Sequence, residues 1–328
     1  MTAAAIPELV LRSRALRERL RTEAGPLAGA PIGTVPILWN NVDVEDLRLG
    51  TDAVTILDEI ARLGYDGCQL GLGFPEGGEL RGALAARGLR LAEVYAALPV
   101  TTDGPAEGAP DEALERLRLL VAGDGDVLCV ALDGSPERSS WAGRADADET
   151  PRLTPDGWRR LVDVVNDLAR ATAEAGRRLA FHPHAGTFVE TPEETERLLA
   201  ATDADLVPLC LDVGHWLVGG GDPVTALRGY GDRVTHVHLK DVDATVLARL
   251  RSGELADFGA AVRGRLFTEL GSGELDLGGC LAALADRDYR GWLMVEQDSA
   301  WGPPSEAAAI GRRVLAQALR AIDGKAVR

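Results

Sequence analysis

The chain has 328 residues, a formal net charge of −16, and 46% hydrophobic residues. An acidic surface repels nucleic-acid phosphates and anionic lipid, so the composition argues against nucleic-acid and membrane-surface partners. No apolar stretch is long enough to span a membrane, and the first residues lack the apolar core of a signal peptide, so we expect a cytoplasmic protein. The four cysteines lack Cys-x-x-Cys spacing and are typical of buried free thiols.

Short apolar runs alternate with longer amphipathic runs along most of the chain. Residues 1–28 predict a polar helical extension and a linker, and residues 29–328 a single domain. The expected strands are 34–40, 67–73, 89–98, 126–132, 178–184, 206–212, 234–240 and 292–297. These runs are too apolar for a sheet with one solvent-exposed face, so we expect parallel strands that are buried on both faces.

The segments between these runs carry helix-start signals. Thr154 and Asp222 each precede a proline, and Thr191 begins a capping box that ends at Glu194. Eight strand–helix units predict either a closed (β/α)8 TIM barrel or an open doubly wound sheet. No Gly-x-Gly-x-x-Gly fingerprint follows the first strand, which favours the barrel.

Histidines and carboxylates gather at four expected strand ends. All five histidines lie between residues 182 and 238. The polar residues at these ends are His182, His184, Asp212, His236, His238, Lys240 and Glu296. In a barrel these ends form the active face, and side chains two residues apart share a side of the strand. Alone, each residue could be a core histidine, a helix cap or an ion-pair partner. Together they favour a divalent metal site for Mn²⁺, Co²⁺, Zn²⁺ or Mg²⁺.

Other polar residues also fall where they could line the cleft. They are Trp39, Asn40, Asn41, Gln69, Glu93 and Glu269. Trp39 could equally pack in the core, and Glu269 could instead hold the Gly-rich loop that follows it. Lys240 is one of only two lysines in an Arg-rich chain, and an ammonium there could donate to substrate oxygen or act as an acid.

Four motifs carry a family resemblance. LCLDVGHWLVGGGDP, DRVTHVHLKDVD, FTELGSGELDL and YRGWLMVEQD resemble the xylose isomerase-like TIM-barrel superfamily of sugar isomerases, epimerases and dehydratases. Among its branches, FHPHAGT, PILWNN and the GFP turn are most similar to the inosose dehydratases. The resemblance spans about residues 33–320.

The resemblance implies a metal ion at the barrel mouth, with Mn²⁺ or Co²⁺ ahead of Mg²⁺ and Zn²⁺. The implied ligands are Asp212, His238 and Glu296, with His182 where the superfamily usually has Glu. That departure leaves open whether His182 binds metal or acts as acid or base. Gln69 also replaces a common Glu, and Leu72-Gly73 replaces a His-Lys pair, so the substrate could be a related polyol.

The resemblance implies a metal-dependent dehydratase that acts on a cyclic keto-polyol such as 2-keto-myo-inositol through an enolate. His182, His184 or Glu296 would take the α-proton, and Lys240 or the same group would protonate the leaving hydroxyl. His215 is expected beside the substrate or, with Asp241 and His236, behind the metal ligands.

Several alternatives stay open at this point. A keto-sugar isomerase or epimerase, or a 3-keto-glycoside lyase, would use the same site, and a sugar-binding barrel without catalysis is a different class. The related apurinic endonucleases need early histidine ligands, and no histidine precedes His182. The expected partner is therefore a small molecule, with association into a homo-oligomer a further expectation from the family.

Overall fold

The computed structural model describes residues 12, 14–16 and 27–326. The expected helical extension over residues 1–28 lies almost wholly outside the described residues. Within the described part of the chain, no helix is both long and apolar enough to cross a membrane.

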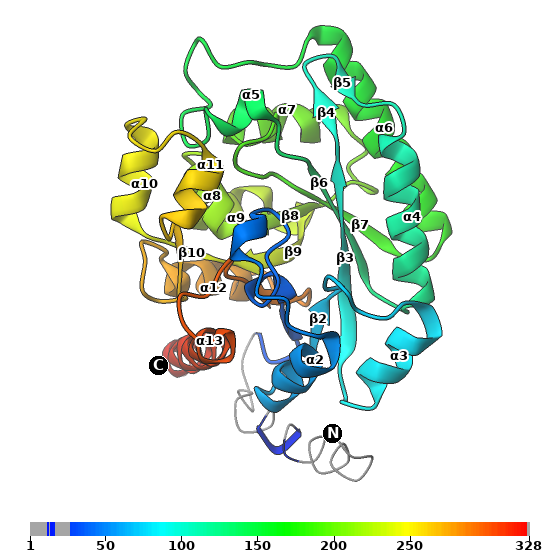
Figure 1. Cartoon of the computed structure of the whole chain (residues 1–328), viewed down its shortest axis with the longest axis vertical. Helices are drawn as coiled ribbons and strands as arrows, with labels where there is room; N and C mark the ends of the chain where they lie inside the picture. The colour runs from blue at the N-terminus through cyan, green and yellow to red at the C-terminus, as the bar shows by residue number, and fades with distance from the viewer. Residues whose placement is uncertain (1–11, 13, 17–26, 327–328) are drawn as a thin grey trace.

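Eight parallel strands close into a barrel, most of them labelled in Figure 1. Their order around the barrel is β1-β12-β9-β8-β7-β6-β3-β2. The barrel strands are β1 (Ile32–Thr34), β2 (Gly67–Gln69), β3 (Arg90–Leu98), β6 (Val127–Leu132), β7 (Arg178–His182), β8 (Leu209–Asp212), β9 (Val234–Leu239) and β12 (Leu293–Val295). Each apolar run named above overlaps one of these strands, and the expected (β/α)8 barrel is confirmed.

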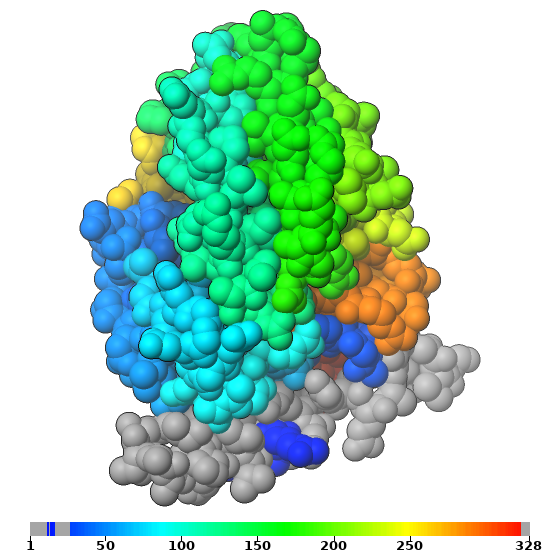
Figure 2. Space-filling view, turned by 90° about the vertical axis from the view of Figure 1, so that its right-hand side faces the viewer, coloured from blue at the N-terminus to red at the C-terminus, as the bar shows by residue number. Residues whose placement is uncertain are grey.

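Helices surround the barrel, and Figure 2 shows two of them, α4 and α6, packed side by side on one outer face. The helices are α2 (Ala53–Arg62), α3 (Gly77–Ala85), α4 (Ala109–Ala122), α5 (Pro136–Ser139), α6 (Pro155–Glu174), α7 (Pro192–Ala201), α8 (Val213–Val218), α9 (Pro223–Tyr230), α10 (Ala244–Arg251), α11 (Phe258–Arg263), α12 (Leu277–Ala285) and α13 (Pro304–Ala326). Short 3₁₀ turns span Pro36–Leu38, Glu45–Leu47 and Gly231–Arg233. Two small antiparallel pairs are β4 (Val100–Thr101) with β5 (Gly104–Pro105), and β10 (Asp241–Val242) with β11 (Phe267–Thr268).

The helix-start signals act as the sequence predicts. The side chains of Thr154 and Asp222 accept hydrogen bonds from backbone N–H groups in the first turns of α6 and α9. Thr191 and Glu194 form the reciprocal capping box at the start of α7. Such caps satisfy backbone donors that have no partner within the helix.

The first strand differs from the prediction. The expected strand spans residues 34–40, but β1 ends at Thr34 and a 3₁₀ turn follows from Pro36 to Leu38. β1 pairs with β12 on one side and β2 on the other, so each of its residues must take part in a ladder. Pro36 has no N–H to donate, which ends the strand. Trp39 and Asn40 therefore lie in the loop that follows β1 and not at the end of a strand.

Candidate metal and substrate site

The C-terminal ends of four adjacent strands bring together the implied metal ligands. His182 ends β7, Asp212 ends β8, His238 lies near the end of β9, and Glu296 directly follows β12. Asp212 pairs in register with His238. All four side chains are buried. The apolar residues that precede each of them form the strand, so the polar group emerges at the barrel mouth.

The ligand atoms of these residues converge at the barrel mouth. His238 Nδ1 lies 2.6 Å from Glu296 Oε2 and 3.8 Å from Asp212 Oδ2. His182 Nε2 lies 3.6 Å from Asp212 Oδ2. Among the described residues, His238 Nδ1, Asp212 Oδ2 and Glu296 Oε2 are buried and accept no hydrogen bond.

Buried polar atoms in proteins nearly always have a hydrogen-bond partner or another bound group, such as a water molecule or an ion. Ligands of one divalent ion, bound at about 2.1 Å, lie roughly 3 Å apart. His182, Asp212 and His238 each offer an atom within 4.8 Å of the others, and could hold a metal ion together. The donor set therefore fits a divalent ion with mixed nitrogen and oxygen ligands.

Glu93 is placed differently from the expected cleft lining. Its side chain is 0% exposed inside the barrel, where Oε2 accepts hydrogen bonds from Nε2 of His236 at 2.6 Å and of His238 at 3.0 Å. Burial raises the pKa of Glu93, but the charges and hydrogen bonds of His238 and His236 outweigh it and hold the pKa well below its usual value. Because Nε2 of His238 donates to Glu93, its Nδ1 is the nitrogen that faces the carboxylates. His236 thus shares its carboxylate partner with the candidate ligand His238.

Lys240 is surrounded by acceptors. Its Nζ lies 2.7 Å from Asp298 Oδ1, 2.9 Å from Glu296 Oε1 and 3.0 Å from His215 Nε2. Burial lowers the pKa of Lys240, but the carboxylates of Asp298, Glu296 and Asp212 outweigh it and hold the pKa well above its usual value. A lysine held as a cation is a poor proton donor near neutral pH, so this environment favours a positioning role over the expected acid role.

The sequence reasoning missed Asp298. The signal was its spacing, because it follows Glu296 by two residues, and such pairs share a side of an extended chain. Burial and the neighbouring carboxylates raise the pKa of Asp298 to about 7, although the Lys240 charge opposes them. Asn41 holds this segment, since its side-chain amide donates to the carbonyl oxygen of Asp298 and to the hydroxyl of Ser299.

His184 and His215 stack next to the metal candidates, with ring centroids 3.8 Å apart. His184 Nδ1 lies 2.9 Å from the carbonyl oxygen of Ala185, so we assign the proton to Nδ1 and leave Nε2 as an acceptor. The backbone N–H of Ala185 donates to His215 Nδ1. Burial, His182 and Lys240 lower the pKa of His184 to about 3. His184 is therefore neutral at physiological pH.

A cavity of about 460 Å³ opens beside His184 at the barrel mouth. Pockets for small ligands usually measure roughly 300–1,000 Å³. Its lining includes Tyr95, Ser135, Ser139, His184, Gly186 and Phe258. The sequence did not point to Tyr95 or Phe258, because their apolar surroundings make them indistinguishable from core residues. The Tyr95 ring lies edge-on to His182, with centroids 6.0 Å apart, which connects the cavity to the metal candidates.

Trp39 and Asn40 do not line this cavity. Trp39 is 1% exposed and its indole N–H donates to Glu59 Oε2 at 2.6 Å. The side chain of Asn40 bonds to both the N–H and the carbonyl oxygen of Thr51. Both residues hold the loop after β1 against α2, so the core-packing alternative for Trp39 agrees with the structure.

Asp241 stabilises a loop through hydrogen bonds and does not orient a proposed metal ligand among the described residues. Its carboxylate accepts hydrogen bonds from the N–H groups of Gly271, Gly273 and Leu275, within the Gly-rich segment after Glu269. The expected contact with the ligands is absent among the hydrogen bonds of the described residues. Glu269 is half-buried and accepts a hydrogen bond from the Thr268 hydroxyl. Gln69 ends β2 and is also half-buried.

The fold and these residues define a (β/α)8-barrel protein with a candidate divalent-metal site at the mouth of the barrel. Residues 57–318 match the family model described as xylose isomerase-like TIM barrel. The chain belongs to this family, as its motifs predict.

Similar proteins support the same placement. An inosose dehydratase of Geobacillus kaustophilus (strain HTA426) is 36% identical over 87% of this chain and 93% of its own length. An inosose dehydratase of Clostridium botulinum (strain Alaska E43 / Type E3) is 32% identical over 87% of this chain and 95% of its own. The solved structure of L-ribulose 3-epimerase shares the fold, with a TM-score of 0.68, 18% identity, and coverage of 91% of this chain and 97% of that one.

Proposed function

We propose that this chain is a metal-dependent dehydratase that removes water from a cyclic keto-polyol such as 2-keto-myo-inositol. It is an enzyme of the dehydratase or isomerase/epimerase type, which its inosose dehydratase relatives support. The observation that carries the proposal is the convergence of three buried ligand atoms, on Asp212, His238 and Glu296, near a cavity of ligand size.

The chain's own residues would hold the ion at the barrel mouth. Asp212, His238 and Glu296 are the proposed ligands, and His182 completes the set. Mn²⁺ or Co²⁺ suits a site with two imidazoles and two carboxylates. When bound, such an ion supplies Lewis-acid polarisation of a ketone oxygen. We propose that residues 29–328 form a single domain that carries the whole site.

His184 is the proposed base. Its Nδ1 is bonded to the carbonyl oxygen of Ala185, so Nε2 carries the free electron pair, and the residue lines the cavity. Nε2 takes the proton from the carbon next to the ketone, and the electron pair of that C–H bond forms an enolate. The ketone re-forms as those electrons make a double bond between the α- and β-carbons, and the bond between the β-carbon and its hydroxyl oxygen breaks; the resulting enol tautomerises to the dione. The departing hydroxyl takes the proton from His184 and leaves as water, so the base is restored.

Lys240 keeps the carboxylates in place during this exchange. Its ammonium contacts both Glu296 and Asp298, and so neutralises part of their mutual repulsion. The hydrogen bond from Asn41 to the carbonyl oxygen of Asp298 joins the loops after β1 and β12.

The test is proton exchange followed by NMR. Protein loaded with Mn²⁺ or Co²⁺ is incubated in D₂O with 2-keto-myo-inositol, the metal is removed with a chelator, and the products are analysed. Loss of water to a dione is the expected result. Deuterium at the α-carbon without elimination would assign the isomerase or epimerase reaction instead. No reaction of the metal-loaded protein with this ketone would refute the proposed substrate.

The metal assignment is tested by a double change, Asp212→Asn with His238→Gln. We expect loss of stoichiometric metal and of turnover, because both changes remove a ligand atom. Asp163→Asn is the matched control, since this aspartate is exposed on α6. Undiminished turnover by the double variant would contradict a metal-dependent reaction.

A further inference from the structure

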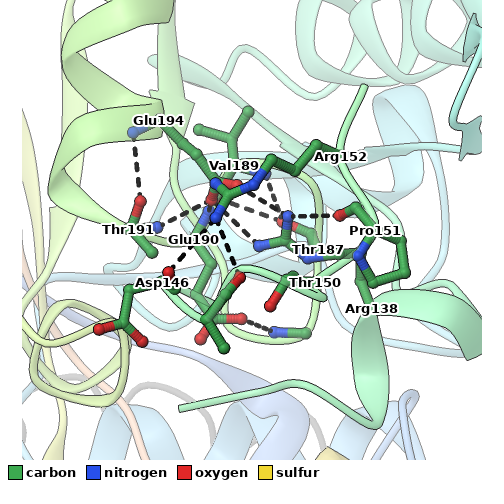
Figure 3. Close-up of polar contacts among 12 residues, drawn as sticks. Arg138, Asp146, Thr150, Pro151, Arg152, Thr187, Val189, Glu190, Thr191 and Glu194 are labelled. Carbon is green, nitrogen blue, oxygen red and sulfur yellow. Dashed lines mark hydrogen bonds and ion pairs between the residues drawn. The ribbon is translucent and has the colours of Figure 1, made fainter. Parts of the chain in front are cut away.

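Figure 3 shows a buried ion-pair network, and residues next to it in the chain line the cavity. Arg138, on the short helix α5, is 0% exposed and forms a two-pronged pair with Glu194 on α7, with N–O distances of 2.7 and 3.0 Å. Glu194 Oε2 also accepts the N–H groups of Glu190 and Thr191. The network therefore joins the segment after β6 to the segment after β7.

Glu190 completes this connection with both carboxylate oxygens. Oε1 accepts the N–H of Gly143 and Oε2 accepts the N–H of Gly186, each at 2.7 Å. Gly143 belongs to the connection between β6 and α6, and Gly186 to the loop between β7 and α7. Glu190 itself is 2% exposed and is not among the residues that line the cavity.

Both connected segments form the cavity wall. Ser135 and Ser139 come from the first, and His184 and Gly186 from the second. Gly186 has a φ of +77°, and a Cβ built there would lie 3.4 Å from Ser139 Cα and from Phe258 Cβ. The loop is thus packed against its neighbours, so a shift of Gly186 changes the shape of the cavity. The same loop carries His184, whose N–H donates to Val189.

Stability alone is a poor reason to keep this carboxylate. Buried charges cost desolvation energy, and ion pairs in cores often contribute little net stability. Burial raises the pKa of Glu190 to about 7, although the hydrogen bonds from Gly186 and Gly143 and the charge of Arg138 oppose it, and Glu194 is the other charged group close by. A neutral side chain would cost less at this position. What a carboxylate supplies is two acceptors that point at two different loops.

We propose that Glu190 is a positioning residue for the substrate cavity. It fixes the spacing between the segment with Gly143 and the loop with Gly186, and so sets the shape of the cavity that binds the substrate. The inference rests on the proposed function only where the substrate is used as a readout. The network does not touch Asp212, His238 or Glu296, so its effect is separable from metal binding.

The experiment compares Glu190→Gln and Glu190→Asp with Glu193→Gln as the matched control. Glu193 is exposed on the same helix start, so its change removes a charge without altering the connection. Glutamine keeps the size but turns an N–H₂ group toward one of the two glycine N–H groups, and aspartate is too short to reach both. Hydrogen–deuterium exchange of segments 140–146 and 183–189 is measured by mass spectrometry, with Mn²⁺ affinity and steady-state kinetics on 2-keto-myo-inositol.

We expect exchange in both segments to accelerate about tenfold, as loss of a buried hydrogen bond implies. KM should rise about tenfold while kcat falls less, since ground-state and transition-state binding are lost together. Mn²⁺ affinity should match that of the control within about twofold, which is ordinary additivity for separate sites.

Unchanged exchange and KM in a folded Glu190→Gln protein would overturn the proposal. So would a loss of Mn²⁺ affinity, because Glu190 would then act through the metal site. If neither Glu190 variant folds, the role is stability and the proposal fails. If the unaltered enzyme does not react with the ketone, the proposed substrate fails, while the exchange data still decide whether Glu190 positions the two loops.

Discussion

Replacing Glu93 by glutamine is expected to weaken Mn²⁺ binding by about tenfold or more, although Glu93 is not one of the proposed ligands. Its carboxylate is wholly buried and accepts hydrogen bonds of 2.6 and 3.0 Å from His236 and His238. Hydrogen bonds to a buried charge are each worth about 1.5–3 kcal/mol. Loss of a carboxylate that orients a ligating histidine usually costs about 10–100-fold in metal affinity.

Competition with protons sets the conditions for this measurement. Burial lowers the pKa of His238, but Glu93 and Glu296 outweigh it and raise the pKa well above its usual value. The metal-free histidine is therefore protonated, and an ion must displace that proton from Nδ1. Metal affinity should rise with pH for this reason. Glu93 attracts a divalent ion more strongly than a single proton, so its loss still weakens metal binding.

Titration calorimetry with Mn²⁺ at pH 6 and pH 8 measures both effects, and far-UV circular dichroism checks the fold. Glu190→Gln is the matched control, because it makes the same chemical change at another buried glutamate that has no contact with the metal candidates. The reasoning is refuted if folded Glu93→Gln protein binds Mn²⁺ as tightly as the control at pH 8.

Three further predictions concern the core and its charges. Lys240→Met should destabilise the metal-free protein by about 3–5 kcal/mol in urea unfolding, since it leaves buried carboxylates unpaired. Added Mn²⁺ should restore part of this loss. Equal stability of the metal-free variant and the metal-free unaltered protein would contradict this role of Lys240. Trp39→Phe should lower the free energy of unfolding by about 1 kcal/mol, because the hydrogen bond to Glu59 is lost, and should leave KM unchanged. A large rise in KM would instead show that Trp39 contacts the substrate. Because the pKa of Glu190 rises from 4.5 to about 7 on folding, it contributes stability below pH 4.5 that is lost as pH rises through 7. The rise corresponds to about 3 kcal/mol at most, and unfolding at pH 5 and pH 8 should show a flatter pH dependence for Glu190→Gln than for the unaltered protein.

Much of the architecture could be predicted because its signals are local. Buried parallel strands must be apolar along their whole length, so the eight runs stand out from the amphipathic helices between them. Helix caps at Thr154, Thr191 and Asp222 depend on residues within one turn. The sequence predicts the first strand too far along the chain, because the apolar run continues beyond Pro36. The strand cannot continue there, since proline has no N–H to donate to the strand ladder.

The candidate site, like the fold, has features that the sequence predicts and features that it does not. Their positions at the carboxyl ends of apolar runs place His182, Asp212, His238 and Glu296 at one end of the barrel, since parallel barrel strands all end at the same rim. The family motifs then imply the ligand set. Neither argument reveals which nitrogen of His238 faces the ion.

The sequence by itself thus determined the barrel, the family and the strand ends that carry the polar residues, because these follow from short-range periodicity and motifs. Only the tertiary structure decided the partners of individual polar side chains. Glu93 meets histidines more than 140 residues away, and Glu190 ties two loops that each lie beside the cavity. Burial, hydrogen bonding and pKa depend on neighbours that folding brings together from distant strands, and no local pattern records them.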